Sequence, residues 1–495
     1  MKKNFSVLIA LISVVCTISI NLQAQKTGTT RTVSGIVTDN SNNPLPGVSI
    51  ILTGTDKGTA TDRSGKYSLE VPENATLMFM YLGCTTQKIA VENQQEINVI
   101  MKERDLDEGI KPAKPIDLTA RQHARAKVDN GFAFKMFQEV SKQEGENTFF
   151  SPLSLHIALG MLYNGSSGNT RKEIVETLGL TGFTESEINE YYQKISQSLL
   201  EVDPSTNIGI ANSIWFRDEF SAKDRFVEIG KKYFDTEVKA LDFNTPQAAN
   251  SINKWCADKT NKKISQIVSS PIPKDMMMYL INALYFKSKW ETSNRFDEQK
   301  TKSDDFTKTD NQKKKVNMME QTTYLSYYAD EHLQCVELDY GNRAFSTVVI
   351  LPSKNMNINQ LIQYLDNAKW QGAVNDMWRQ KVWLKLPRFK IECDFSLNQP
   401  IRHLGMEGIF SGGFANISDD PLWVSTIKQK TFVEVNEEGA EAYALSSITV
   451  VGYGVQRKVP DEPVRFFADR PFLFLIREKS TGVILFIGRI DEPVE

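Results

Sequence analysis

The sequence predicts a multidomain chain in which a small all-β sandwich precedes a larger α+β body. Short alternating apolar runs separated by Gly, Pro, Asn and Asp fill residues 32–102, a pattern typical of a β-sandwich. A charged stretch with two Lys-Pro pairs follows at 103–116 and indicates a linker. From residue 117 onward, helical apolar spacing appears first, and strand-like runs continue to residue 495.

The first 24 residues have the pattern of a secretory signal. Lys2 and Lys3 form a charged start, and the apolar run from Val7 to Ile20 is short for a membrane span. Cleavage is expected after Ala24. We therefore expect an exported protein that is not transmembrane and that lies in the periplasm, at the outer membrane or outside the cell.

Composition and charge narrow the class of function. The chain is 41% hydrophobic and 24% charged, as in an ordinary soluble globular protein, and its net charge is −3. So small a net charge gives no electrostatic reason to expect nucleic acid or an anionic membrane as a partner. The cysteines beyond the signal lack disulfide or metal-ligand spacing, so we expect buried free thiols and no metal. They are Cys84, Cys256, Cys335 and Cys393.

The elements of the α+β body follow in order along the chain. Helical spacing puts Phe132, Met136 and Val140 on one face, and residues 157–162 have the composition of a buried helix. Strand-like apolar runs follow at 346–351, 382–386 and 472–476. The last run is nearly continuous, so we expect it to be buried on both faces.

Catalytic motifs are missing from the sequence. The patterns G-x-S-x-G, H-E-x-x-H, the P-loop and C-x-x-C do not occur, and the histidines are isolated from one another. His156 lies in an apolar helical run and is expected to be a core histidine. We therefore expect no enzyme activity and no cofactor. A hydrolase whose site is assembled from distant segments is a rival class.

An unusual stretch begins at the acidic pair Glu437 and Glu438, directly before Gly439. Successive side chains of a strand point to opposite faces. One face of the following residues would be small or apolar and free of charge: Ala440, Ala442, Ala444, Ser446, Ile448 and Val450. Such a face fits the middle of a sheet, so the stretch is predicted to be a loop that is able to become a strand.

Four motifs characterise the N-terminal part: Val33 to Asp39, Pro44 to Val48, Gly58 to Asp62 and Gly65 to Leu69. With these motifs, residues 32–102 resemble the carboxypeptidase-regulatory-like β-sandwich domain. In Bacteroidetes this module typically precedes TonB-dependent outer-membrane transporters. The resemblance implies a Bacteroidetes-type bacterium and a spacer or docking module without a catalytic site, with association to the cell envelope as an expectation.

A second set of motifs runs in order through residues 117–495: Asn147 to Ser154, Asn282 to Trp290, Val316 to Met319, Leu386 to Lys390, Leu404 to Met406, Phe432 to Gly439, Ala468 to Phe474, and Gly488 to Arg489. These collinear motifs strongly resemble a serpin. The resemblance implies a serpin fold with a large central sheet and an exposed reactive loop at about 437–470. It also implies a protease inhibitor, expected here to be a monomer.

The resemblance implies a mechanism for this loop. A serine protease, or in some cases a cysteine protease, cleaves the loop and becomes acylated. The loop then inserts into the main sheet and the trapped protease is distorted. The hinge residues implied are Glu437, Glu438, Gly439, Ala440, Ala442 and Ala444. The alternative is a non-inhibitory serpin that acts as a binding or envelope-associated protein.

Family spacing implies that the reactive bond joins Tyr453 and Gly454, which predicts a chymotrypsin-like target. The stretch from Gly439 to Pro471 is several residues longer than usual, so other bonds stay open. Val450 or Val451 would suit elastase-like proteases, and Arg457 or Lys458 would suit trypsin-like ones.

Further residues match family positions beneath and beside the sheet. Ser151, Ser154 and Asn282 match the shutter region, and Trp290 ends the strand of the breach region. Gln429 stands where the family usually has a histidine. Because Gln both donates and accepts hydrogen bonds, a neutral network is expected there, without the pH sensitivity of histidine.

The segment from Val450 to Lys458 has a second resemblance. Transporters that carry the same N-terminal module often have a similar V-V-G-Y-G-x-Q-[RK]-K stretch just after it. This gives the hypothesis that the loop is bait for a protease that cuts such segments in the cell envelope.

Overall fold

The computed structural model describes residues 30–39, 42–53, 55, 57–81, 87–101, 113–142, 147–260, 262, 264–440 and 462–494. The predicted signal and most of the predicted linker lie outside these residues. The chain divides into two compact units, Met1–Gly109 and Ile110–Glu495.

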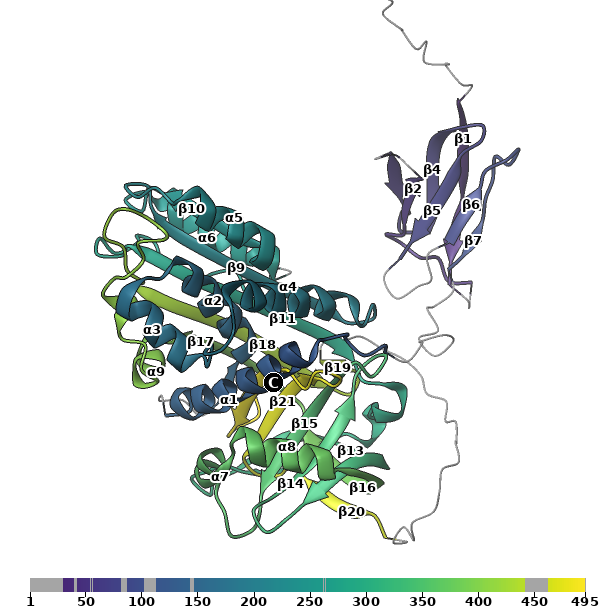
Figure 1. Ribbon diagram of the computed structural model, residues 1–495. Coiled ribbons are helices and arrows are strands. Elements are labelled where there is room, and N and C mark those ends of the chain that lie inside the picture. Colours follow the sequence, from purple (N-terminus) through teal and green to yellow (C-terminus); the bar gives the residue numbers. More distant parts are fainter. Residues whose placement is uncertain are drawn as a thin grey trace, which may run out of the picture. The chain divides into compact units, whose positions relative to one another are not determined.

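The first unit is a β-sandwich with one three-stranded sheet, β4-β1-β7, and one four-stranded sheet, β3-β2-β5-β6 (Figure 1). Strand β4 alternates strictly between exposed and buried residues, as a half-buried strand must. The inward residues, among them Val33, Ile50 and Phe79, form a core of their own. The strands are β1 (Thr30–Thr38), β2 (Ser49–Leu52), β3 (Gly58–Ala60), β4 (Lys66–Pro72), β5 (Thr76–Met80), β6 (Gln87–Ala90) and β7 (Val99–Ile100).

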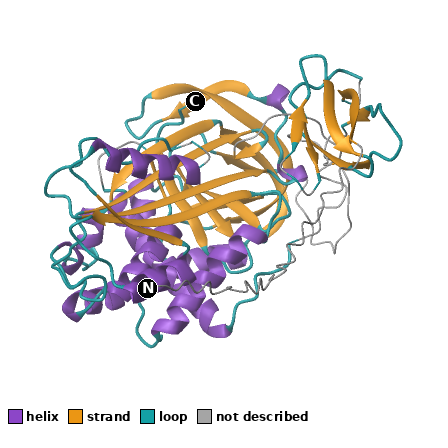
Figure 2. Cartoon of the chain, turned by 90° about the horizontal axis from the view of Figure 1, so that it is seen from above, coloured by secondary structure: helices purple, strands orange, loops and turns teal. Residues whose placement is uncertain are grey.

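The second unit contains helices that gather mostly on one side of its long strands (Figure 2). They are α1 (Ala120–Val140), α2 (Pro152–Gly165), α3 (Gly168–Thr177), α4 (Glu185–Glu201), α5 (Asp224–Phe234), α6 (Pro246–Lys259), α7 (Ile358–Tyr364), α8 (Asn367–Asp376) and α9 (Asn398–His403). Short 3-10 turns are η1 (Thr292–Asn294), η2 (Glu298–Lys300) and η3 (Gly408–Phe410).

Helix α2 is buried along its whole length. Ser151 caps its first turn and Pro152 opens it, a combination that suits a helix start. Gly160 lets Tyr192 of α4 pack against the helix, because a Cβ at this glycine would lie 2.5 Å from the tyrosine ring. The helix therefore sits as a rigid layer between the other helices and the sheet.

One sheet of this unit has six strands in the order β10-β9-β11-β19-β18-β17. Its strands are β9 (Asn207–Arg217), β10 (Thr236–Leu241), β11 (Met278–Lys289), β17 (Phe389–Ser396), β18 (Thr426–Asn436) and the short β19 (Gly439–Ala440).

The other sheet has nine strands, eight of them in the order β20-β16-β13-β14-β15-β21-β22-β8, with β12 paired to β13. They are β8 (Thr148–Phe150), β12 (Lys302–Thr307), β13 (Lys313–Ala329), β14 (Leu333–Asp339), β15 (Phe345–Pro352), β16 (Trp378–Pro387), β20 (Val464–Phe467), β21 (Phe472–Glu478) and β22 (Ile484–Ile490). The predicted strand runs correspond to β15, β16 and β21, and β21 is buried throughout.

The predicted fold class, a β-sandwich followed by an α+β body with a large sheet, is confirmed. The stretch 437–470 that was predicted as loop contains β19 at one end and β20 at the other, because both ends pair with neighbouring strands. Cys256, Cys335 and Cys393 are free and buried, and burial raises the pKa of Cys256 to about 12, while Cys84 lies outside the described residues. In the described part of the chain, no helix is long and apolar enough to cross a membrane.

Candidate functional site

The neighbouring strands β11 and β18 are joined along only part of their length. Their parallel pairing runs from Tyr279–Thr426 to Ala283–Lys430, and we call this stretch the closed half. Beyond it, β11 residues 284–289 and β18 residues 431–436 form the open half, where no direct ladder pair joins the two described strands. The two strands are therefore not joined to each other in the open half, where a further strand can lie between them.

The chain itself begins to fill the open half. After β18 it turns at Glu437 and Glu438 and returns as β19, which is antiparallel to both neighbours. Ala440 pairs with Ser288 on β11 and Val435 on β18. Ala440 is only 1% exposed, so its methyl group already belongs to the core. We call Glu437–Ala440 the hinge segment.

Gly439 is required by the closeness of β11. Its φ of +145° is a conformation that side chains rarely adopt. A Cβ at this position would lie 2.3 Å from the backbone oxygen of Ser288 and 2.6 Å from Cα of Lys289. Both obstacles are backbone atoms, so any side chain here would push β19 away from β11.

Glu437 fixes the turn before β19. It is 3% exposed, and its Oε1 accepts a hydrogen bond of 2.7 Å from Nε of Arg388. The hydroxyl of Thr301 donates to the same oxygen, and the backbone N–H of Phe296 donates to the Glu437 carbonyl at 3.1 Å. The buried carboxylate is held by a charged partner and a hydroxyl donor, and the backbone carbonyl of the same residue is held by a third donor, so these contacts position the hinge segment.

Trp290 packs at the end of β11 beside the turn. Its ring Nε1–H donates to the carbonyl of Asn436 at 2.9 Å, and its backbone N–H donates to the carbonyl of Glu438 at 2.8 Å. The indole is 1% exposed and stacks on Tyr340 with a centroid distance of 4.5 Å. The indole therefore connects the turn to the second sheet.

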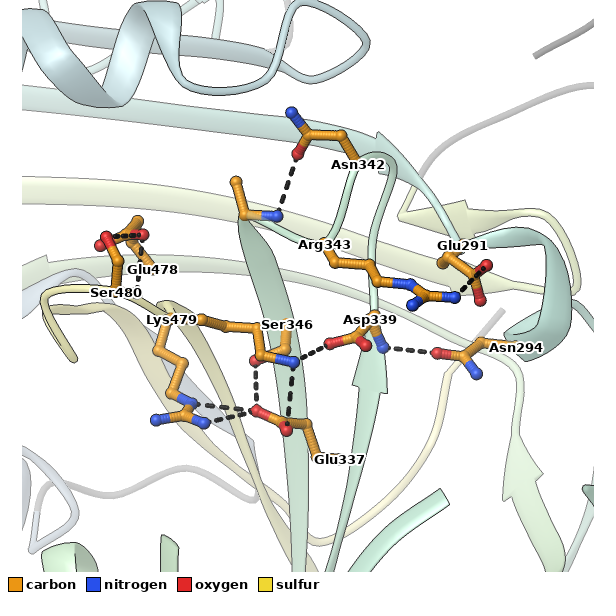
Figure 3. Close-up of polar contacts among 12 residues, drawn as sticks. Glu291, Asn294, Glu337, Asp339, Asn342, Arg343, Ser346, Glu478, Lys479 and Ser480 are labelled. Carbon is orange, nitrogen blue, oxygen red and sulfur yellow. Dashed lines mark hydrogen bonds and ion pairs between the residues drawn. The ribbon is translucent and has the colours of Figure 1, made fainter. Parts of the chain in front are cut away.

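A network of polar and charged side chains includes Glu291, the residue that follows Trp290 in the chain (Figure 3). The backbone N–H of Glu291 donates to the carbonyl of Asp339 at 2.8 Å. Lys479 pairs with Asp339 and lies 3.4 Å from Glu337, which also receives Arg477 at 2.6 Å.

Burial opposes ionisation of both acids in this network. The nearby cations Arg477 and Lys479 nevertheless hold the pKa of Glu337 below its usual value. Burial together with the charge of Glu337 raises the pKa of Asp339 despite Lys479. The pKa values of the two carboxylates therefore shift in opposite directions, because Glu337 has two nearby cations and Asp339 is additionally opposed by the negative charge of Glu337.

The closed half rests on the start of α2. Gln429 of β18 accepts from the backbone N–H of Ser151 at 2.8 Å and donates to the Ser151 carbonyl at 2.9 Å. Just beyond the closed half, Thr431 donates its hydroxyl to the carbonyl of Phe149 in β8, the strand before α2. The amide side chain of Gln429 thus satisfies both the N–H and the carbonyl of Ser151, and neither partner in this contact is ionisable.

Helix α2 is in turn tied to its neighbours by a buried cluster. Nε2 of His156 lies 3.3 Å from Oδ1 of Asp129, which pairs with Arg125 on α1, and Oδ2 accepts from Tyr191 at 2.9 Å. Burial lowers the pKa of His156 to about 4, although the carboxylate of Asp129 opposes this shift. His156 is a core histidine, as predicted, and it is neutral at physiological pH.

The sequence-predicted site residues fall into two groups. Glu437, Glu438, Gly439, Ala440 and Trp290 meet at the open half, and Ser151, Ser154 and Gln429 meet at the closed half, where the N–H of Ser154 donates to Oγ of Ser151 at 3.3 Å. Asn282 stands opposite Gln429 in the ladder, and its side chain is outside the described atoms. Outside the described residues lie Ala442, Ala444, Val450, Val451, Tyr453, Gly454, Arg457 and Lys458.

Sequence reasoning assigned no role to Arg388 and Thr301, which hold Glu437. Arg388 is 49 positions away from Glu437 and Thr301 is 136 positions away. The one available signal was the unusual acidic pair before Gly439, because a carboxylate that is to be buried needs a cation. Nothing in the sequence pattern says which cation that is.

Comparisons with known proteins agree with this geometry. A family model for serpins, serine protease inhibitors, matches residues 127–493, and a model of the CarboxypepD_reg-like domain matches residues 33–109. Iripin-1 from Ixodes ricinus is 32% identical over 374 residues, which covers 74% of this chain and 93% of that protein.

Solved structures are similar over the same region. The native state of tengpin, a thermophilic serpin, is matched with a TM-score of 0.68 and 27% identity, covering 78% of this chain and 98% of tengpin. Human thyroxine-binding globulin is matched with a TM-score of 0.69 and 26% identity, covering 76% and 100% of the two chains. The chain therefore belongs to the serpin family, and a CarboxypepD_reg-like domain precedes its serpin domain.

Proposed function

We propose that this serpin inhibits a serine protease by inserting the part of its reactive segment that lies between β19 and the cut bond, from Glu441 onward, into the open half between β11 and β18. The observation that supports the proposal is the position of β19. This strand already runs between the two neighbours, and its direction leads along the open half, where no ladder pair joins β11 to β18 in the described residues.

The register of β19 predicts where the next residues would go. If its pairing continues, Ala442 comes to lie between Phe286 and Val433, and Ala444 comes to lie between positions 284 and 431. Phe286 and Val433 are 6% and 4% exposed, so these alanines would face the core. The small, uncharged face predicted from the sequence is therefore the face that has to be buried.

Insertion past Ala444 has to separate the closed half. The next residue, Leu445, would take the place of the Ala283–Lys430 pair, the first pair of that half. Where the inserted strand separates β11 from β18, one strand pairing is lost and two are gained. Each net backbone hydrogen bond gained stabilises the product by about 1 kcal/mol. Roughly a dozen inserted residues would stabilise the product by about 12 kcal/mol, as large as the whole stability of many domains. The uncleaved form is thus proposed to be kinetically trapped.

The proposed target is a chymotrypsin-like protease that cuts between Tyr453 and Gly454. An elastase-like enzyme acting at Val450 or Val451 is the second choice, and a trypsin-like enzyme acting at Arg457 or Lys458 is the third. We propose that the protein is exported, acts as a monomer and meets its target in the periplasm, at the outer membrane or outside the cell.

The rival function is that of a non-inhibitory binding protein, since thyroxine-binding globulin is among the similar structures. The alanines at 440, 442 and 444 favour inhibition, because a carrier that never inserts its loop needs no small inward face. Cleavage without a covalent complex would support the rival.

The deciding experiment mixes the protein separately with chymotrypsin, elastase and trypsin. We expect a complex with one of them that survives denaturing electrophoresis, and a C-terminal peptide whose first residue identifies the cut bond. Ala442→Arg should turn the inhibitor into a substrate, whereas Tyr443→Arg, on the opposite face, should leave complex formation intact. Equal behaviour of the two variants would rule out strand insertion. An envelope extract is tested in parallel for the bait hypothesis, which fails if only exogenous proteases are trapped.

A further inference from the structure

The outer face of strands β13, β16 and β20 is both aromatic and basic. In a ladder, directly paired residues point to the same side. Tyr324 pairs with Lys381, and Trp383 pairs with Arg465. The residues of this side are exposed or half-buried, whereas the alternating positions of β16 are buried. We call this side the basic-aromatic face, after Tyr324, Arg379, Lys381, Trp383, Lys385, Arg465 and Phe467; Glu320, Thr322 and Ser326 of β13 lie on the same side.

The aromatic residues of this face are held rigidly. The indole Nε1–H of Trp383 donates to Glu320 at 2.7 Å, and Phe467 meets the indole edge-on with a centroid distance of 5.0 Å. The guanidinium of Arg465 lies 5.4 Å from the centre of the Trp383 ring. Cations stacked on aromatic rings are ordered before a partner arrives, which lowers the entropic cost of binding.

Most of the positive charge of this face is not neutralised within the described chain. Lys385 pairs with Asp304 at 2.8 Å. By contrast, Arg379, Lys381 and Arg465 make no ion pair with any described residue. Tyr324 is 47% exposed beside them. An acidic partner would therefore find three cations that have no ion-pair partner among the described residues, next to the rings of Tyr324 and Trp383, while the carboxylate of Glu320 on this side is engaged by the Trp383 indole.

The position of this face relative to the reactive segment points to its partner. The described chain resumes at Glu462, and β20 begins two residues later at Val464, paired with Val382 of β16. Val464 is eleven positions after Tyr453 in the sequence. A protease that holds Tyr453 in its active site is therefore tethered to within about 40 Å of the basic-aromatic face, the span of eleven extended residues.

We propose that the basic-aromatic face is a second recognition surface for the target protease, and that it takes an acidic patch beside the protease active site. The inference rests on the proposed inhibitory function and adds a determinant of target choice outside the reactive segment. Charge complementarity of this kind acts mainly on the rate of association and is weakened by salt.

The test compares chymotrypsin with chymotrypsin whose surface lysines have been succinylated, after matching their activities on a small peptide substrate. The wild type should trap the acidic, succinylated enzyme about 10-fold faster at low salt. The triple variant Arg379→Glu, Lys381→Glu, Arg465→Glu should lose this preference. The matched triple variant Lys172→Glu, Lys194→Glu, Lys231→Glu changes the net charge equally on exposed positions of α3, α4 and α5, and should keep it.

Each outcome separates the two hypotheses. If no covalent complex forms with either enzyme, the proposed inhibitory function fails. If complexes form but all three proteins show the same preference, or both triple variants lose it alike, the recognition surface is refuted. Binding of dextran sulfate is measured in parallel. If the Arg379→Glu, Lys381→Glu, Arg465→Glu variant loses dextran sulfate binding but traps both enzymes at unchanged rates, the face binds anionic polysaccharides and the proposal is overturned.

Discussion

The two halves of the β11–β18 contact show one strand pair in two states. In the closed half the strands bind each other directly and rest on Ser151 through Gln429. In the open half they are separated by β19, and the turn before β19 is held by Arg388 and Trp290.

The difference lies in what satisfies the strand edges. In the closed half, the backbone groups of β11 and β18 pair directly with each other. In the open half, the edges depend on a two-residue strand whose position relies on one glycine and one buried carboxylate. The two halves are therefore expected to differ in stability, and the open half is expected to respond first to perturbation.

The largest effect is expected from charge reversal at Glu437. Glu437→Lys puts a second cation beside Arg388 in a buried position, which should destabilise the protein by about 3–5 kcal/mol. Urea unfolding measures this loss. The double variant Glu437→Lys, Arg388→Glu should recover part of it. Glu438→Gln is the neighbouring control, because the carboxylate of Glu438 approaches Lys289 only to 3.9 Å and its Oε2 accepts no hydrogen bond, so removal of this charge should change stability by about 1 kcal/mol or less. Similar losses at 437 and 438 would show that the Arg388 contact does not hold the open half.

Acidification is expected to weaken the support of the closed half. The pKa of His156 is about 4 in the folded protein, against an ordinary value of 6.5. Between these values the unfolded chain binds a proton that the folded chain does not, so stability falls as the pH drops from about 6.5 to about 4. The loss from this group is about 3 kcal/mol.

The variant His156→Gln isolates this contribution. The difference in unfolding free energy between pH 7 and pH 4 should be about 3 kcal/mol smaller in the variant than in the wild type. Groups other than His156 titrate in both proteins and cancel in this comparison. An unchanged pH dependence would mean that His156 is not kept neutral by its surroundings.

A methyl group at position 439 should selectively disturb the open half. Gly439→Ala brings a Cβ into contact with the backbone of β11, and we expect a loss of about 2 kcal/mol together with a larger fraction of protein cleaved without trapping the protease. Gly372→Ala is the matched control, since nothing lies within 4 Å of a Cβ at that exposed helical site. It should be neutral or slightly stabilising. If Gly439→Ala behaves like this control, β19 does not need its close approach to β11.

The smallest effect is expected from Gln429→His. A neutral imidazole can both donate and accept, so it can replace Gln429 against Ser151 at pH 7. Once protonated, it no longer accepts from the Ser151 N–H, and about 1 kcal/mol of stability should be lost below about pH 6.5. Thermal melting of this variant in the His156→Gln background reports the new titration alone. The prediction fails if the added histidine leaves the pH profile unchanged.

The sequence predicted much of this architecture, for physical reasons that can be named. Alternation along 66–72 and the apolar run at 472–476 are local patterns, and both form the expected strands. The small face that starts at Ala440 is equally local. The contact of Gln429 with Ser151 spans 278 positions and was anticipated only through the family resemblance.

The parts that escaped prediction are long-range polar contacts. Glu437 had several possible cationic partners, and only the folded chain selects Arg388. The basic-aromatic face was also missed, because its members come from three strands that are remote in sequence and meet only through the ladder pairs. Side-chain periodicity gives the face of a strand but not its neighbour.

The pairing of β20 with β16 bears on whether the two pieces of a cleaved chain stay together. A break between Tyr453 and Gly454 would divide the polypeptide into two pieces, yet the shorter piece contains β20, β21 and β22. In the sheet, β21 lies between β15 and β22, and β22 lies between β21 and β8. The two pieces would remain a single particle without a covalent bond between them. Protein that is cut without trapping a protease would therefore leave a size-exclusion column where the intact protein does, and only a denaturing gel would reveal that the chain has been cut.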